Sequence, residues 1–254
     1  MSGPVPLGLV DWRLPVSGAS AVTLAASLGV GRLQVDVGGP GRTPLLAPEL
    51  PALLRACRDH QVGIDAVACN RLNDLGLHGL AHAVRVRQTL AEAVHLAHAL
   101  GAPLILVPGF RLSRIHTAEH LRASSRQLAF ACDLAHARGL EVAYESDLDA
   151  ATTLHLIRQV GRRNFTLLLD PGNLAQAGHV LPALLRALTG HWCPQVHIKG
   201  GWPDTAQRRQ LLASLRRPAA NCCFYLENDY RQGIADLPAD LRQLRALFNY
   251  PEID

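Results

Sequence analysis

Stretches with the pattern of buried strands alternate eight times with stretches of helical periodicity along this chain. The strand-like stretches are short apolar runs that stop at turn or polar residues, which is typical of strands buried on both faces of a parallel sheet. Strict alternation requires parallel strands joined by right-handed crossovers. Strands are predicted at 7–10, 32–37, 63–68, 103–107, 141–145, 166–170, 194–198 and 222–226, and helices at 20–28, 49–60, 84–100, 117–138, 149–160, 180–189, 205–216 and 236–248.

Eight strand–helix units in 254 residues predict an α/β fold with a single closed (β/α)8 barrel, the TIM barrel, spanning 1–254 as one domain. The main alternative is an open doubly wound sheet that binds a dinucleotide. That fold needs a glycine-rich phosphate loop after its first strand. Here Asp-Trp-Arg-Leu-Pro follows at 11–15, so the barrel is favoured.

Composition narrows the class of protein further. Hydrophobic residues make up 48% of the chain and charged residues 18%, which predicts a large core and disfavours disorder. The net charge is only +4 and the arginines are scattered, so we expect no nucleic-acid partner. No apolar run is long enough to cross a membrane, and the N-terminal sequence does not resemble a signal peptide. The six cysteines lack metal-type spacing, and reduced thiols in a cytoplasmic protein are the favoured interpretation.

Four consecutive predicted strands end in polar residues that are common metal ligands. These residues are Glu145, Asp170, His197 and Glu227. The carboxyl ends of parallel barrel strands meet at one mouth, where barrel enzymes keep their chemistry. Three carboxylates and one imidazole would destabilise one another there unless a cation neutralised them. This set suits Mn²⁺, Mg²⁺, Co²⁺ or Fe²⁺, with Zn²⁺ as a further candidate.

Each of these residues also has an ordinary structural interpretation. Asp170 precedes Pro-Gly and could cap the next helix, and Glu145 could be a solvated strand end. His197 could be a hydrogen-bonded barrel histidine, and Glu227 could pair with an arginine such as Arg231. The occurrence of ligand-type residues on four strands in succession favours a metal site over coincidence.

Three motifs resemble those of the xylose isomerase-like TIM barrels, the sugar phosphate isomerase/epimerase superfamily. They are Leu-Val-Pro-Gly at 106–109, Leu-Asp-Pro-Gly-Asn-Leu at 169–174 and Val-His-Ile-Lys at 196–199. The superfamily includes tagatose/psicose 3-epimerases, hydroxypyruvate isomerases, inosose dehydratases and inosose isomerases. The resemblance covers essentially the whole chain and implies that Glu145, Asp170, His197 and Glu227 bind a divalent metal.

The resemblance further implies an isomerase or epimerase acting on a small sugar, a polyol-derived ketone or a keto acid. Proton abstraction beside a carbonyl would proceed through a metal-bound enediolate, with Glu145 and Glu227 removing and returning the proton. Lys199 could donate to a substrate oxygen. A dehydratase using the same site is the alternative. Further residues expected to contact substrate are Asn173, Trp12, Asn70, Phe110 and Trp202.

The chain departs from the superfamily pattern at two positions. Several relatives have His where Asn173 stands, and many have Asp where Gly200 stands. The extra histidines of the DNA-repair branch, endonuclease IV, have no counterparts at the ends of the first three strands. Two other functions remain open: Schiff-base aldol chemistry by Lys199, which the nearby carboxylates disfavour by raising its pKa, and a non-catalytic barrel. A homodimer or homotetramer is compatible with the resemblance.

Overall fold

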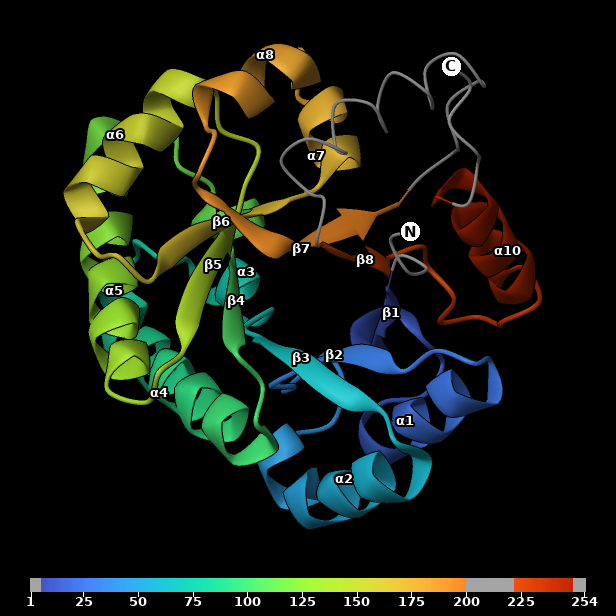
Figure 1. The fold of residues 1–254 in the computed structure, drawn as a ribbon. Coiled ribbons are helices and arrows are strands. Elements are labelled where there is room, and N and C mark those ends of the chain that lie inside the picture. Colours follow the sequence, from blue (N-terminus) through green and yellow to red (C-terminus); the bar gives the residue numbers. More distant parts are fainter. Residues whose placement is uncertain (1–5, 200–221, 249–254) are drawn as a thin grey trace.

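The structure, a computed structural model that describes residues 6–199 and 222–248, is a closed barrel of eight parallel strands (Figure 1). The strands follow one another around the barrel in chain order, and β8 pairs with β1 to close it. This confirms the predicted (β/α)8 barrel. The strands are β1 Leu7–Val10, β2 Arg32–Asp36, β3 Gly63–Ala68, β4 Leu104–Pro108, β5 Glu141–Glu145, β6 Phe165–Leu169, β7 Trp192–Ile198 and β8 Cys223–Leu226.

Most of the described helices form an outer ring around the barrel (Figure 1). The described helices are α1 Gly18–Ser27, α2 Leu46–His60, α3 Leu72–Leu75, α4 Ala83–Leu100, α5 Ala118–His136, α6 Ala150–Val160, α7 Pro171–Gln176, α8 Leu181–Ala187 and α10 Leu237–Phe248. The short helix α3 is seen near the middle of the view, beside β4 (Figure 1). Short 3₁₀ turns occupy Asp11–Arg13, Leu80–His82 and Arg111–Ser113. The helix predicted at 205–216 lies outside the described residues.

Two short helices, α3 and α7, were absent from the sequence prediction. Helix α7 begins immediately after β6, where Pro171 occupies the first turn and Asp170 caps the N-terminus. Proline is favoured at that position because its missing N–H would have no partner there in any case. The Asp-Pro-Gly sequence therefore starts a helix, although Pro-Gly usually indicates a turn.

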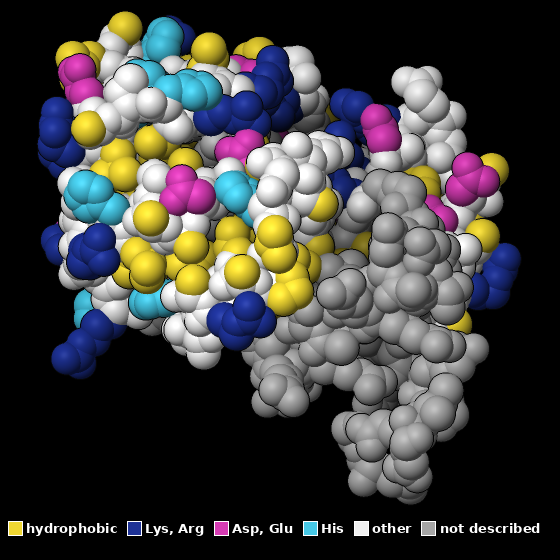
Figure 2. All heavy atoms as spheres, turned by 90° about the horizontal axis from the view of Figure 1, so that it is seen from above, with side chains coloured by type: hydrophobic (Ala, Val, Ile, Leu, Met, Phe, Trp, Pro, Cys, Tyr) yellow, Lys and Arg dark blue, Asp and Glu magenta, His cyan; other side chains and the backbone are white. Residues whose placement is uncertain are grey.

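The large apolar core lies between the helices and the outer face of the barrel. Figure 2 shows one outer face, on which the basic side chains lie in several separate places. None of the described helices is long and apolar enough to cross a lipid bilayer. All six cysteines are free, as predicted.

The inside of the barrel is filled by alternate residues of the strands, because successive side chains of a strand point to opposite faces. Separate small clusters there contain Ala66, Ala68, Leu104, Leu106, Ala143, Leu168 and Cys193, and Val10, Cys223 and Tyr225. The same alternation, continued to the carboxyl ends, reaches a ring of mostly polar residues at the mouth: Trp12, Asp36, Asn70, Pro108, Glu145, Asp170, Lys199 and Glu227. His197 lies one step deeper and is fully buried.

Gly8 gives a test of this interior packing. A Cβ at Gly8 would lie 2.3 Å from Cε1 of the Tyr225 ring, which is completely buried. We expect Gly8→Ala to lower the free energy of unfolding by about 1–3 kcal/mol because the ring must move. For a chain of this size each kcal/mol lowers Tm by roughly 2–4 °C.

The matched control is Gly63→Ala at the start of β3, where the nearest heavy atom to a new Cβ is 3.8 Å away. Thermal unfolding followed by circular dichroism compares the two variants. Equal Tm values for both variants would contradict the packing described for the barrel interior.

Candidate metal centre and substrate cavity

The four predicted ligands come together at the mouth of the barrel. Glu145, Asp170, His197 and Glu227 each offer one ligand atom, and these atoms all lie within 4.8 Å of one another. All four side chains are buried. Strand β7 carries His197 and β5 ends at Glu145, whereas Asp170 and Glu227 directly follow β6 and β8.

Asp170 caps a helix and also belongs to the ligand cluster. Its Oδ1 accepts a hydrogen bond from the backbone N–H of Asn173 at 2.9 Å and so caps helix α7. Its Oδ2 lies 2.8 Å from Lys199 Nζ, on the side of the ligand cluster. The helix therefore fixes the carboxylate while one oxygen stays directed at the cluster.

A chain of buried hydrogen bonds orients His197. The backbone carbonyl of Asp65 accepts from Gln195 Nε2 at 2.9 Å, so the Oε1 end of Gln195 accepts from Gln34 Nε2 at 2.6 Å. Gln34 Oε1 is thereby left to face His197 Nε2 at 2.7 Å. The Asp65 carbonyl can only accept a hydrogen bond, which fixes the orientation of the Gln195 amide and, through it, that of the Gln34 amide. Gln34 therefore presents its carbonyl oxygen to His197, so His197 Nε2 carries the proton.

The other ring nitrogen of His197 faces the carboxylates. Nδ1 lies 3.3 Å from Glu227 Oε2 and 3.6 Å from Glu145 Oε2, and it makes no hydrogen bond of normal geometry to the described residues. A histidine whose distal N–H is held by an amide carbonyl is arranged as metal-binding histidines usually are. Nδ1 among these carboxylates is therefore a place where a divalent cation could replace a proton.

Cations of the protein also contact the carboxylates. Lys199 Nζ lies 3.0 Å from Glu227 Oε2. Glu227 Oε1 accepts from Trp12 Nε1 at 3.0 Å, and Arg13 Nε lies 3.5 Å from the same oxygen. The sequence allowed Glu227 to pair with an arginine such as Arg231. Arg13 approaches it instead, and Arg231 pairs with Asp229.

Burial and mutual charge shift the pKa values of these groups. Burial lowers the pKa of His197, but Glu145 and Glu227 outweigh it and raise that pKa to about 10. Burial and the neighbouring Glu145 raise the pKa of Asp170 to about 6 against the opposing effect of Lys199. Burial would raise the pKa of Glu227, but His197 and Lys199 hold it well below its usual range. The cluster attracts positive charge strongly, which is the condition for binding a cation.

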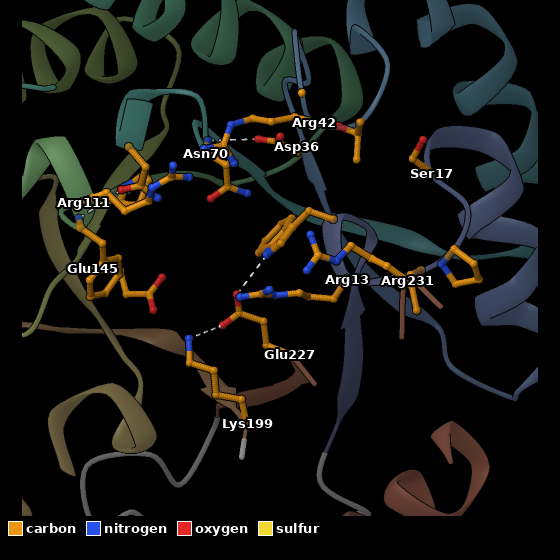
Figure 3. Close-up of a pocket in the computed structure, with 18 of the residues that line it drawn as sticks. Arg13, Ser17, Asp36, Arg42, Asn70, Arg111, Glu145, Lys199, Glu227 and Arg231 are labelled. Carbon is orange, nitrogen blue, oxygen red and sulfur yellow. Dashed lines mark hydrogen bonds and ion pairs between the residues drawn. The ribbon is translucent and has the colours of Figure 1, made fainter. Parts of the chain in front are cut away.

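A cavity of about 730 Å³ opens above the cluster (Figure 3). This is an ordinary size for a small-molecule site. Four of the residues predicted to contact substrate line it, namely Trp12, Asn70, Phe110 and Asn173, together with Lys199, Glu145 and Glu227. Trp202, also predicted, lies outside the described residues, as does Gly200.

Asn173 has a specific contact within the site. Its side-chain Nδ2 donates to Glu145 Oε1 at 2.9 Å. Asn173, a position where the sequence was expected to depart from the superfamily pattern, therefore orients one of the two carboxylates expected to move protons.

Several residues of the site went unrecognised in the sequence. Arg13, Asp36, Arg42, Arg111 and Arg231 line the cavity, and Gln34 and Gln195 support His197 from below. A signal existed for Asp36 and Gln34, because strand alternation puts them on the inward face of β2. The arginines lie on loops or 3₁₀ turns, where no periodicity shows the direction of a side chain.

The fold and the cluster define the chain as a (β/α)8 barrel with a buried Glu, Asp, His, Glu set that could bind a metal. Residues 22–248 match the family described as xylose isomerase-like TIM barrel. A curated relative, the 2-epi-5-epi-valiolone 7-phosphate 2-epimerase of Actinoplanes sp. (strain ATCC 31044 / CBS 674.73 / SE50/110), is 40% identical over an alignment of 254 positions covering 94% of this chain and 93% of the relative.

Solved structures agree on the fold. A xylose isomerase domain protein from Planctomyces limnophilus has a TM-score of 0.74 at 18% identity and covers 97% of this chain and 98% of its own. An L-ribulose 3-epimerase has a TM-score of 0.71 at 19% identity, with 98% and 89% covered. The chain belongs to the xylose isomerase-like TIM barrel family, and the comparisons support an enzyme of the epimerase or isomerase kind.

Metal content tests the cluster directly. We expect gently purified protein, or protein dialysed against Mn²⁺ and then washed, to hold about one divalent ion per chain. Glu145→Gln and Asp170→Asn each remove a ligand charge and should lose that ion, as measured by elemental analysis.

Asp133→Asn is the matched control, because this exposed carboxylate pairs with Arg162 on the outer ring. It should keep the metal. Metal content equal to wild type in both cluster variants would exclude the proposed centre.

Proposed function

We propose that the protein is a divalent-metal-dependent epimerase that acts on a phosphorylated, sugar-like ketone by moving a proton at the carbon beside the carbonyl. The observation that carries this proposal is the convergence of two carboxylates from different strands, Glu145 at the end of β5 and Glu227 after β8, each with one oxygen near His197 Nδ1. Two proton carriers on different strands suit an inversion, because one can remove a proton and the other can return it.

A divalent cation held by Glu145, Asp170, His197 and Glu227 would polarise the oxygens of a carbonyl and its neighbouring hydroxyl and so acidify the C–H between them. Mn²⁺, Mg²⁺ and Co²⁺ are the ions that this set suits best, with Zn²⁺ or Fe²⁺ as further candidates. The protein's part is to hold the carboxylates in position. Asn173 orients Glu145, and Trp12 orients Glu227 by hydrogen bonds of 2.9 and 3.0 Å.

Lys199 would act as a donor to a substrate oxygen. Its ammonium contacts Asp170 and Glu227, and although burial alone would lower its pKa, these carboxylates with Glu145 raise it above the usual value. A Schiff-base lysine needs a lowered pKa, so this environment argues against aldol chemistry.

The phosphorylated substrate class rests on the relative and on the mouth of the cavity. The 40% identical relative is named for a ketone phosphorylated at position 7 and inverted at position 2. In this chain Arg42 and Arg111 line the cavity and share a single carboxylate, Asp74. Two guanidinium groups on one carboxylate leave positive charge for an anionic group.

Solvent deuterium exchange tests the function. In D₂O with Mn²⁺, we expect wild-type protein to incorporate deuterium beside the carbonyl in at least one member of a panel of ketose phosphates, cyclic polyol ketones and keto acids, read by NMR and mass spectrometry. Glu145→Gln and Glu227→Gln should each slow the exchange by about 10²–10⁴-fold, because each removes a proton carrier.

Glu119→Gln, an exposed change at the start of α5, is the control and should exchange at the wild-type rate. A product 18 mass units lighter than its substrate would indicate the dehydratase alternative, since a hydroxyl then leaves as water. Exchange that is equally fast in all three variants would contradict the proposal.

A further inference from the structure

Two polar residues of the cavity lie across the mouth from the ligand cluster. Asp36 ends β2, and Asn70 follows β3. In the closed strand order, β2 and β3 lie opposite β6 and β7. Figure 3 accordingly shows Asp36 and Asn70 along one edge of the cavity and Lys199 and Glu227 along the other.

The backbone holds Asp36 and Asn70 in fixed positions relative to each other. Asp36 Oδ1 accepts from the Asn70 backbone N–H at 3.0 Å, and the Asp36 N–H donates to Asp11 Oδ1 at 2.9 Å. The Asp36 carboxylate is thus held through Oδ1, with the Gly38 backbone N–H also near it, while Oδ2 makes no hydrogen bond of normal geometry to the described residues. Its second oxygen is left for another partner.

Both side chains carry a polar atom with no hydrogen bond to the described residues. These atoms are Asp36 Oδ2 and Asn70 Nδ2, and the residues are only 1% and 9% exposed. A buried polar group without a partner is destabilising by about 1–3 kcal/mol, so native proteins rarely keep one without a reason. Two such atoms on adjoining strand ends, both on residues that line the cavity, indicate a missing ligand group.

The charge of Asp36 defines what that group must be. Burial raises the pKa of Asp36 to about 6, with the Asn70 backbone N–H and Arg42 opposing the rise. At neutral pH the carboxylate is therefore a charged acceptor beside a neutral amide donor. It would repel a phosphate, and an apolar group would leave both atoms unpaired.

A hydroxyl group satisfies both atoms at once, since it donates one hydrogen bond and accepts others. We propose that Asp36 and Asn70 form a hydroxyl-recognition subsite, in which Asp36 Oδ2 accepts from a substrate hydroxyl and Asn70 Nδ2 donates to the same hydroxyl or its neighbour. The subsite selects sugar-like substrates by the hydroxyl farthest from the carbonyl that the ligand cluster engages. This proposal rests on the proposed function for the identity of the reacting end.

Two substitutions remove the subsite with little change in shape. Asp36→Asn keeps an oxygen for the Asn70 backbone N–H and replaces the free acceptor with a donor. Asn70→Ala removes the free donor and keeps its backbone N–H. Ser124→Ala is the matched control, because it removes another buried, unpartnered polar atom on α5, outside the residues that line the cavity.

The probe set is a monophosphate of the cyclic polyol ketone scyllo-inosose and its monodeoxy analogues, assayed by solvent deuterium exchange with Mn²⁺. Wild-type protein should disfavour the analogue that lacks the recognised hydroxyl by about 10- to 100-fold in kcat/KM. In Asp36→Asn and Asn70→Ala that ratio should fall toward one, mainly because KM for the full substrate rises. The value of kcat should change by less than about threefold, since the lost contact binds the substrate and the transition state equally. Ser124→Ala should keep the wild-type ratio.

The same discrimination measured by calorimetric binding of a myo-inositol monophosphate and its deoxy analogues to the Mn²⁺-loaded protein separates the two proposals. Absence of exchange together with hydroxyl-dependent binding would remove the epimerase and keep the subsite. Wild-type discrimination retained in both variants, an equal loss of kcat on every probe, or no binding by wild-type protein would overturn the subsite. Thermal unfolding and metal content of each variant identify any loss that comes from misfolding.

Discussion

The hydrogen bond between His197 Nε2 and Gln34 Oε1 determines how the mouth of this barrel can function. It directs the other ring nitrogen toward three buried carboxylates, and it is itself fixed by Gln195 and the Asp65 backbone carbonyl. Buried amides without hydrogen-bond partners would be strongly destabilising. Both buried amides here are satisfied, because Gln34 and Gln195 each use their N–H and their carbonyl oxygen. Ala66 and Ala68, which point inward on β3, occupy little volume. They lie in the same barrel interior as the hydrogen-bonded Gln34 and Gln195 side chains.

The mouth is divided by strand order into two halves with different chemistry. Strands β5 to β8 provide the ligand cluster, and β2 and β3 provide Asp36 and Asn70. The same alternation of side chains puts Asp36, Asn70 and the three carboxylates of the cluster in one ring, one step above His197. A substrate bound between them would have its reacting carbon at one side and a recognised hydroxyl at the other. In barrel enzymes, residues on different strand ends and loops have different roles, which is how one fold supports many substrates.

The barrel and the convergence of Glu145, Asp170, His197 and Glu227 at its mouth could be predicted from the sequence because both depend on short-range patterns. Buried strands are apolar runs, and a ligand at a strand end interrupts the run at a recognisable point. Asp170 shows the limit of such reasoning, since the sequence presented helix capping and cluster membership as alternatives while its two oxygens serve both.

Side-chain partners far apart in sequence could not be predicted. Gln34 lies 163 positions from His197, and Trp12 lies 215 positions from Glu227. Barrel closure brings them together, and no local pattern encodes which inward residue meets which. The same reason explains why Arg13 approaches Glu227. Arg231 is nearer to Glu227 in sequence, but the pairing of β8 with β1 brings Arg13 closer in space.

The most direct test of this account is the anomalous scattering of crystals grown with Mn²⁺. The account predicts one anomalous peak about 2.1 Å from His197 Nδ1, with an oxygen of Glu145, Asp170 and Glu227 at similar distance and Nε2 still bonded to Gln34. An ion bound to His197 Nε2 would contradict the account. So would an ion bound elsewhere, with no ion between His197 Nδ1 and the carboxylates.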